Sequence, residues 1–177
     1  MAIIVLAMLV NIPSIDAYSS GRTGSTTSGC GCHSGGSGGV TPSMSGLPSS
    51  YTPGQTYSLT WTAGSPSTGQ GGFNLDASSG TWTNLGNRVQ SSNGELTHSS
   101  DLQRSWTADW TAPSAGSGNV VFDLAVLYAN SNSGTSGDSW GTGSWTVPET
   151  VTQNTPPTVS NVYIGFSTTS GAVTQVY

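Results

Sequence analysis

Residues 119–130 read NVVFDLAVLYAN, and this stretch decides the fold class. From Val120 to Tyr128 the residues at odd-numbered and even-numbered positions alike are apolar or aromatic, and Asp123 is the one exception. The run is rich in β-branched and aromatic residues and follows the glycine-containing GSG at 116–118. These features favour a strand buried on both faces over a helix. We therefore predict that residues 120–128 form a central strand of a β-sandwich.

Segments on both sides of this strand alternate apolar and hydroxyl residues with a period of two, which is typical of half-buried strands. They are YTPGQTYSLTWTAG (51–64), GGFNLDAS (71–78), GTWTNL (80–85), ELTHSS (95–100), RSWTADWTAP (104–113) and SWGTGSWTV (139–147). The pattern predicts an all-β fold, an antiparallel immunoglobulin-like β-sandwich of seven to nine strands over residues 51–147. The predicted core consists of Trp61, Phe73, Trp106, Trp110, Phe122, Leu124 and Val126.

The composition excludes two classes of partner. Charged residues make up 6% of the 177 residues, against a typical ~25%. The chain has no lysine and three arginines, and its formal net charge is −5. Nucleic-acid binding and docking on anionic lipids both need clusters of Lys and Arg. We therefore expect no nucleic-acid partner, and membrane attachment only through an anchor outside this sequence.

The outer segments indicate an exported protein. Residues 1–17 contain AIIVLAMLV, which is too short to span a bilayer and resembles the apolar region of a secretory signal, although no Lys or Arg precedes it. The alternative is a buried first strand. Residues 18–50 form a Gly/Ser-rich approach, 148–157 a proline-stiffened linker, and 158–177 the start of a further β domain. We expect an extracellular or cell-surface location, and hence an oxidising environment for the cysteines.

The approach segment contains the motif Cys30-Gly31-Cys32-His33, which holds both cysteines of the chain. One hypothesis is a c-type haem, because Cys32-His33 forms the end of a C-x-x-C-H signature although Cys30 is one residue too near. His98 and Met44 are then the candidates for a sixth ligand. The alternatives are a strained Cys30–Cys32 disulfide, a zinc or copper site, and free or intermolecularly bridged thiols. The residues leave these alternatives open.

Three further expectations concern His98, the polar residues of 130–138, and enzymatic activity. His98 lies in an alternating segment, which favours a structural role over ligation. Asn130, Asn132 and Asp138 are weak calcium candidates, because their segment lacks the run of carboxylates that tight calcium loops use. It is more typical of a solvated hairpin loop. No hydrolase or phosphate-binding motif occurs, so we expect a non-enzymatic protein.

A family resemblance covers residues 19–147. YTPGQTYSLTWT, GGFNLDA, ELTHSSDLQRSWTADWTAP and GSGNVVFDLAVLYANSNSGTSGDSW resemble the Reeler-like domain, in particular its prokaryotic choice-of-anchor V branch. The resemblance implies an exported β-sandwich on an anchored, multi-domain surface protein, and it implies no common activity. We expect a binding, adhesion or structural module whose partner is an extracellular ligand or a neighbouring surface protein. The alternative is a c-type haem-binding redox or electron-transfer protein.

Overall fold

Nine strands make up the regular structure of the part described by the computed structural model, which comprises residues 18–33, 38–132 and 134–150. The predictions for residues 1–17 and 158–177, and for residues 151–157 of the predicted linker, lie outside this part. The strands are β1 (Pro42–Ser45), β2 (Thr56–Ala63), β3 (Gly71–Ala77), β4 (Thr81–Thr83), β5 (Val89–Ser92), β6 (Glu95–His98), β7 (Ser105–Thr111), β8 (Val120–Tyr128) and β9 (Ser139–Val147).

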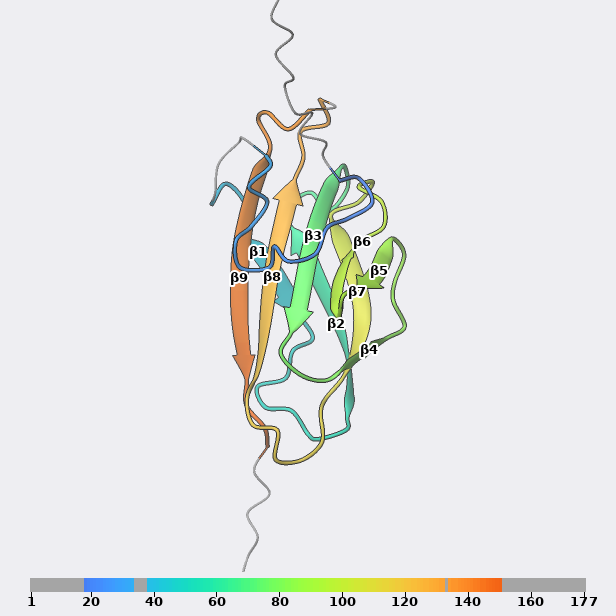
Figure 1. Cartoon of the computed structure of the whole chain (residues 1–177), viewed down its shortest axis with the longest axis vertical. Coiled ribbons are helices and arrows are strands. Elements are labelled where there is room, and N and C mark those ends of the chain that lie inside the picture. The colour runs from blue at the N-terminus through green and yellow to red at the C-terminus, as the bar shows by residue number, and fades with distance from the viewer. Residues whose placement is uncertain (1–17, 34–37, 133, 151–177) are drawn as a thin grey trace, which may run out of the picture.

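The strands form two antiparallel sheets that enclose one core (Figure 1). One sheet has the order β1-β2-β7-β4 and the other β5-β6-β3-β8-β9. These orders match the A-B-E-D sheet of the immunoglobulin sandwich and its G-F-C sheet extended by two edge strands. One difference is that β4 precedes those two edge strands in the chain. The predicted all-β sandwich is confirmed.

The core lies between the two sheets and is rich in tryptophan. All seven predicted core residues are at most 2% exposed. As predicted from the apolar run that only Asp123 interrupts, β8 is a central strand, which pairs with β3 on one side and with β9 on the other. Trp61 of β2 lies opposite Trp106 of β7, and Phe73 of β3 contacts both rings from the other sheet, with ring centroids 5.0 and 4.7 Å away. Each such buried side chain contributes roughly 1.5–3 kcal/mol.

Two edge strands were not predicted from the sequence. β1 lies within residues 18–50, the predicted approach to the sandwich, and it pairs with β2 through Pro42–Ser45. β5 pairs with β6 through Val89–Ser92. Each is four residues long and contains little apolar sequence, since an edge strand packs fewer side chains into the core. Pro42 stands first in its strand, a position that tolerates the loss of a backbone donor.

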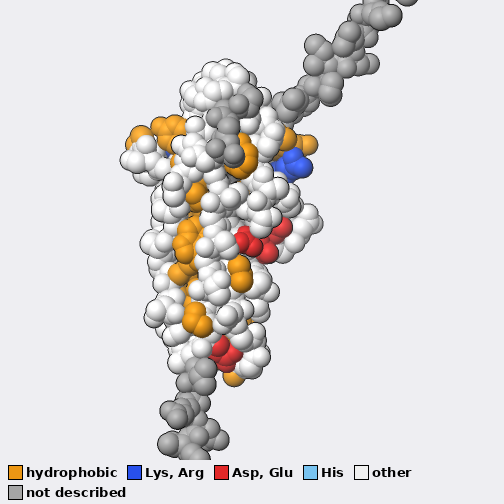
Figure 2. Space-filling model, turned by 90° about the vertical axis from the view of Figure 1, so that its left-hand side faces the viewer, with side chains coloured by type: hydrophobic (Ala, Val, Ile, Leu, Met, Phe, Trp, Pro, Cys, Tyr) orange, Lys and Arg blue, Asp and Glu red, His pale blue; other side chains and the backbone are white. Residues whose placement is uncertain are grey.

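On the side of the molecule that Figure 2 shows, most of the surface is backbone and uncharged polar side chains, with apolar side chains scattered among them. Acidic side chains are few there, and basic ones fewer. In the described part of the chain, no helix is long and apolar enough to cross a membrane.

Candidate functional site

The segment from residue 18 to residue 33, here called the N-terminal strap, crosses the outer face of the five-stranded sheet (Figure 1). Its backbone is bound by side chains of the sheet and not by a neighbouring strand. Gly24 N donates to Glu95 Oε2 at 2.8 Å and Ser25 N donates to Asn74 Oδ1 at 2.8 Å. Further contacts are Arg22 N to Thr97 Oγ1 (3.1 Å), Gln90 Nε2 to Ser20 O and Asn93 Nδ2 to Thr23 Oγ1 (3.1 Å).

The strap explains why polar side chains are buried on this face. Asn74 and Thr97 are 3% and 1% exposed although they lie on the outward side of β3 and β6, opposite each other. Buried polar groups need hydrogen-bond partners. The strap provides one for each residue, through Ser25 N and Arg22 N, and the sheet provides the others. Gly29 has a φ of +75°, and a Cβ there would lie 2.0 Å from the Trp140 ring. The strap therefore packs closely on β9 only because this residue is glycine.

His98 fastens the beginning of the strap. Its Nε2 atom lies 3.1 Å from Tyr18 O, and its Nδ1 atom lies 3.1 Å from Phe73 N. Nδ1 also lies 3.2 Å from Phe73 O. A neutral ring with the proton on Nε2 satisfies the contacts to Tyr18 O and Phe73 N, because Nδ1 then accepts from the Phe73 amide. Burial lowers the pKa of His98, which favours this neutral form. Gly72 makes room for the ring, since a Cβ there would lie 2.6 Å from His98 Cε1.

The CGCH motif forms a hydrogen-bonded turn in which His33 N donates to Cys30 O at 2.9 Å. It lies outside the strands, near the end of the sheet where β3 begins and β8 ends, as the flanking Gly and Ser residues suggested. Both cysteines are free thiols. Burial, together with the nearby Cys32, raises the pKa of Cys30 to about 12. The Arg22 guanidinium donates to Cys32 Sγ, with Nη1 3.4 Å away.

His33 is held by Asp138 from the loop that precedes β9. Nδ1 of His33 lies 2.6 Å from Oδ2 of Asp138, which is 1% exposed. The carboxylate is the acceptor, so the proton stands on Nδ1 and Nε2 is the ring atom left for a ligand. Asp138 Oδ1 accepts from Asn130 N at 2.8 Å. The pair therefore joins the strap to the β8–β9 loop.

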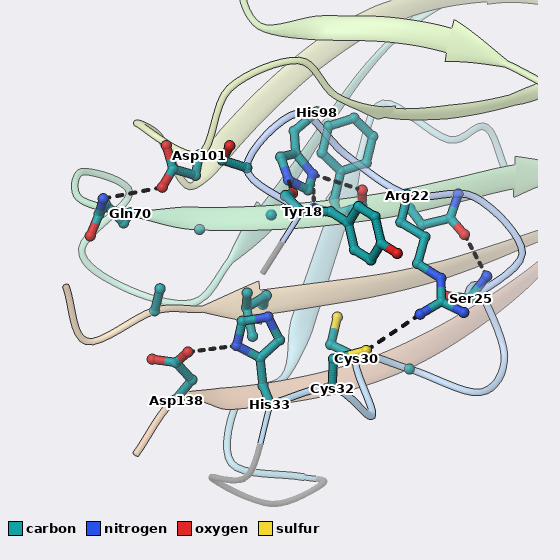
Figure 3. A pocket seen from close by; sticks show the side chains of 18 of the residues that line it. Tyr18, Arg22, Ser25, Cys30, Cys32, His33, Gln70, His98, Asp101 and Asp138 are labelled. Carbon is teal, nitrogen blue, oxygen red and sulfur yellow. Dashed lines mark hydrogen bonds and ion pairs between the residues drawn. The ribbon is translucent and has the colours of Figure 1, made fainter. Parts of the chain in front are cut away.

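These residues surround a pocket of about 340 Å³ (Figure 3). Cys30, Cys32, His33 and His98 all line it, and Asp138 closes one side behind His33. This volume lies within the range of small-molecule sites, about 300–1,000 Å³.

Arg104, which is 5% exposed, fixes part of the pocket wall. It donates through Nε to Gln70 O (2.8 Å) and through Nη2 to Ala129 O (2.7 Å), and both residues line the pocket. A third bond goes from Nη1 to Thr68 O (3.0 Å), and the guanidinium lies 3.4 Å from the centre of the Tyr128 ring. One buried cation thus joins the β2–β3 loop to the end of β8.

The structure separates Met44 from the other candidates. Met44 lies on β1, opposite Trp61, and packs against the core from the four-stranded sheet. The pocket instead faces outward from the five-stranded sheet, so Met44 is not a ligand for a group bound there.

The three calcium candidates lie in the β8–β9 hairpin loop and bond to it. Asn130 Oδ1 accepts from Asn132 N (3.1 Å), and both amide groups donate to Ser136 O (2.9 Å each). Asp138 accepts from His33 and Asn130. In the described ranges, no three His, Cys, Asp or Glu side chains are grouped so as to hold a metal ion.

The fit of a c-type haem can be assessed from the donor atoms. Cys32 and His33 stand together, and a carboxylate on Nδ1 is the usual support of a histidine that ligates through Nε2. Both nitrogens of His98 are bonded to the backbone of Phe73 and Tyr18. The site therefore fits one thioether and one axial histidine, and neither predicted sixth ligand is available.

Sequence reasoning missed four residues that shape this site: Tyr18, Arg22, Asn74 and Arg104. Arg104 carried a usable signal, because a single arginine beside an apolar strand in a chain with only three basic residues suggests a specific role. The strap contacts gave no comparable signal in the sequence, because they join a Gly/Ser-rich backbone to side chains that lie far along the sequence.

No protein-family model matches the chain, and no curated protein matches its sequence. Among solved structures, the chain is similar to the human F-spondin reeler domain, at 22% identity in two crystal structures. These matches cover 62% and 64% of this chain and 88% and 94% of the other, with TM-scores of 0.48 and 0.47. The Reelin-N domain of F-spondin matches at 20% identity over 75% of this chain and 94% of that one, with a TM-score of 0.48. The similarity concerns the fold alone.

Proposed function

We propose that the chain is an exported, surface-attached β-sandwich module that binds a ligand in the strap pocket. The pocket carries this proposal. Three separate parts of the chain enclose it: the strap, the edge of the sheet where β3 begins and β6 ends, and the β8–β9 loop. Hydrogen bonds from specific side chains hold these parts together. Concave sites that combine apolar walls with a few placed polar groups are the usual form of ligand sites.

Export and attachment rest on the sequence. The signal-like residues 1–17 and the resemblance to the prokaryotic Reeler-like branch support them. We infer a role in adhesion or ligand display, in which the partner is an extracellular small molecule or a group presented by a neighbouring surface protein. The proposed role is non-enzymatic.

Binding can be tested with a fragment library and ligand-observed NMR on the full chain. Ala129 lines the pocket, so Ala129→Leu would partly fill it. The matched control is Ala115→Leu, which makes the same change in the exposed β7–β8 loop. We expect fragments that bind the wild type and Ala115→Leu but not Ala129→Leu. Equal binding by all three proteins, or binding by none, would contradict a ligand site in this pocket.

A second candidate function is c-type haem binding, which the Asp138-supported His33 favours. Cys32 would supply the thioether and His33 the axial nitrogen, and the bound haem would supply redox chemistry at iron. The test is the visible spectrum of the protein exported from a host that matures c-type haem. A Soret band that is lost in Cys32→Ser, shifted in His33→Ala and unchanged in His98→Ala supports this function. Absence of the band in the wild type excludes it.

A further inference from the structure

We propose that Cys30 and Cys32 form a redox-active dithiol that exchanges with external disulfides, with Cys32 as the attacking thiol and Cys30 as the resolving thiol. This redox activity goes beyond the proposed binding role, although both cysteines line the proposed binding pocket. The proposal and covalent haem attachment exclude each other, because both use the sulfur of Cys32.

The first observation is that the two thiols belong together. They line one pocket, and a single residue separates them in a hydrogen-bonded turn. They are also the only cysteines in the sequence. Figure 3 shows their side chains side by side. If one of the two sulfurs forms a mixed disulfide with an external thiol, the other cysteine is the only thiol of the same chain that can displace that thiol.

The second observation is the difference between the two sulfurs. Arg22 donates to Cys32 Sγ, and its guanidinium lies 5.8 Å from the centre of the Tyr18 ring, which stands at the same pocket. A neighbouring guanidinium stabilises a thiolate, and the thiolate is the form that attacks disulfides. Burial raises the pKa of the Cys30 thiol to about 12, although Arg22 acts in the opposite direction, so this thiol stays protonated. This asymmetry assigns attack to Cys32 and resolution to Cys30.

The exchange balances as two displacements at sulfur. The Cys32 thiolate attacks one sulfur of a disulfide R–S–S–R′, the S–S bond breaks, and R′–S⁻ leaves with the electron pair. R′–S⁻ takes up the proton of the Cys30 thiol. The Cys30 thiolate then attacks Cys32 Sγ, forms the Cys30–Cys32 bond and releases R–S⁻. The dithiol loses two electrons, and the external disulfide gains them.

Ring size makes the product reversible. A disulfide across one intervening residue closes a small, strained ring, and strained disulfides are more easily reduced than structural ones. Gly31 can adopt more backbone conformations than other residues, so the ring can adjust. The space beside it is open, since no atom outside its two chain neighbours lies within 4 Å of the position a Cβ would take. The pair is therefore suited to repeated exchange and poorly suited to holding the fold together.

The test is to treat the reduced full chain with oxidised glutathione and to follow its intact mass. We expect the wild type to lose two hydrogens. Cys30→Ser should stop at one glutathione adduct, and Cys32→Ser should react at least about tenfold more slowly. Arg22→Gln should slow the first step about threefold to tenfold, whereas the control Arg88→Gln should not. Cys30→Ala is a second trapping variant if Cys30→Ser does not fold.

Three results would overturn the proposal. The first is equal adduct formation by Cys30→Ser and Cys32→Ser. The second is a wild type that carries two glutathione adducts and shows no loss of two hydrogens. The third is a mass gain of one haem on Cys32 after export from a haem-maturing host. None of these results bears on fragment binding, so the proposed binding function is tested separately.

Discussion

The Nδ1 atom of His33 lies 2.6 Å from the Oδ2 atom of Asp138, which joins residues 105 positions apart. Because Asp138 is almost fully buried and also accepts from Asn130 N, it stabilises both the strap and the β8–β9 loop.

Replacing this carboxylate should destabilise the protein. We expect Asp138→Asn to lower the free energy of unfolding by about 1–3 kcal/mol, because an amide has one acceptor oxygen where the carboxylate uses two, for His33 Nδ1 and for Asn130 N. Urea denaturation followed by tryptophan fluorescence measures the change. The control is Asp101→Asn, a half-buried carboxylate that accepts from Gln70 Nε2 at 3.1 Å. An Asp138→Asn effect no larger than that of the control would contradict the assigned role.

Arg104 should tolerate lysine poorly. Its three bonds to backbone carbonyls need a planar fork with several donors, which an ammonium group does not provide. We expect Arg104→Lys to cost about 2–3 kcal/mol of stability. Arg88→Lys is the matched control, with an expected change below about 0.5 kcal/mol, since Arg88 makes one long side-chain bond, to Gln103. Equal unfolding midpoints for the two variants would be evidence against a structural role of the guanidinium fork.

Stability should fall on mild acidification through His98. Burial lowers the pKa of His98 below its ordinary value of 6.5. In the window between the two values the unfolded chain binds a proton that the folded chain does not, so acidification favours unfolding. The contribution is fully present above pH 6.5 and is lost as the pH falls through the folded-state pKa.

Unfolding free energies measured from about pH 7 to pH 5 can separate the contribution of His98 from that of the carboxylates, because Asp and Glu side chains ordinarily titrate at lower pH. We expect the wild type to lose stability over this interval and His98→Gln, which starts from a lower stability, to lose less. A steeper dependence in His98→Gln than in the wild type would refute this assignment.

The sandwich could be predicted from the sequence because apolar alternation reports directly on burial. Trp61, Trp106 and Trp110 occupy alternate positions of β2 and β7, and all three are buried. Short edge strands such as β5 carry almost no apolar residues, so alternation could not reveal them.

The site was predictable in its residues and not in its assembly. The CGCH spacing pointed to Cys32 and His33, and both line the pocket. Their partners Arg22 and Asp138 could not be identified, because Asp138 reaches His33 only after the hairpin and the strap have both folded. Met44 was a candidate ligand from its residue type alone, and its position on β1 instead packs it, partly buried, against the core from the four-stranded sheet.

The central claim is that the N-terminal strap docks on the sheet and thereby builds the pocket. Backbone amide exchange measured by NMR tests it most directly, because Arg22, Gly24 and Ser25 donate their amides to side chains of the sheet. We predict exchange at these three amides at least about a hundredfold slower than in an unstructured peptide. In Thr97→Val, which removes the acceptor of Arg22, this protection should be lost at Arg22 and retained at the β8 amides. Exchange of the three wild-type amides at the rate of an unstructured peptide would contradict the docked strap and the pocket that depends on it.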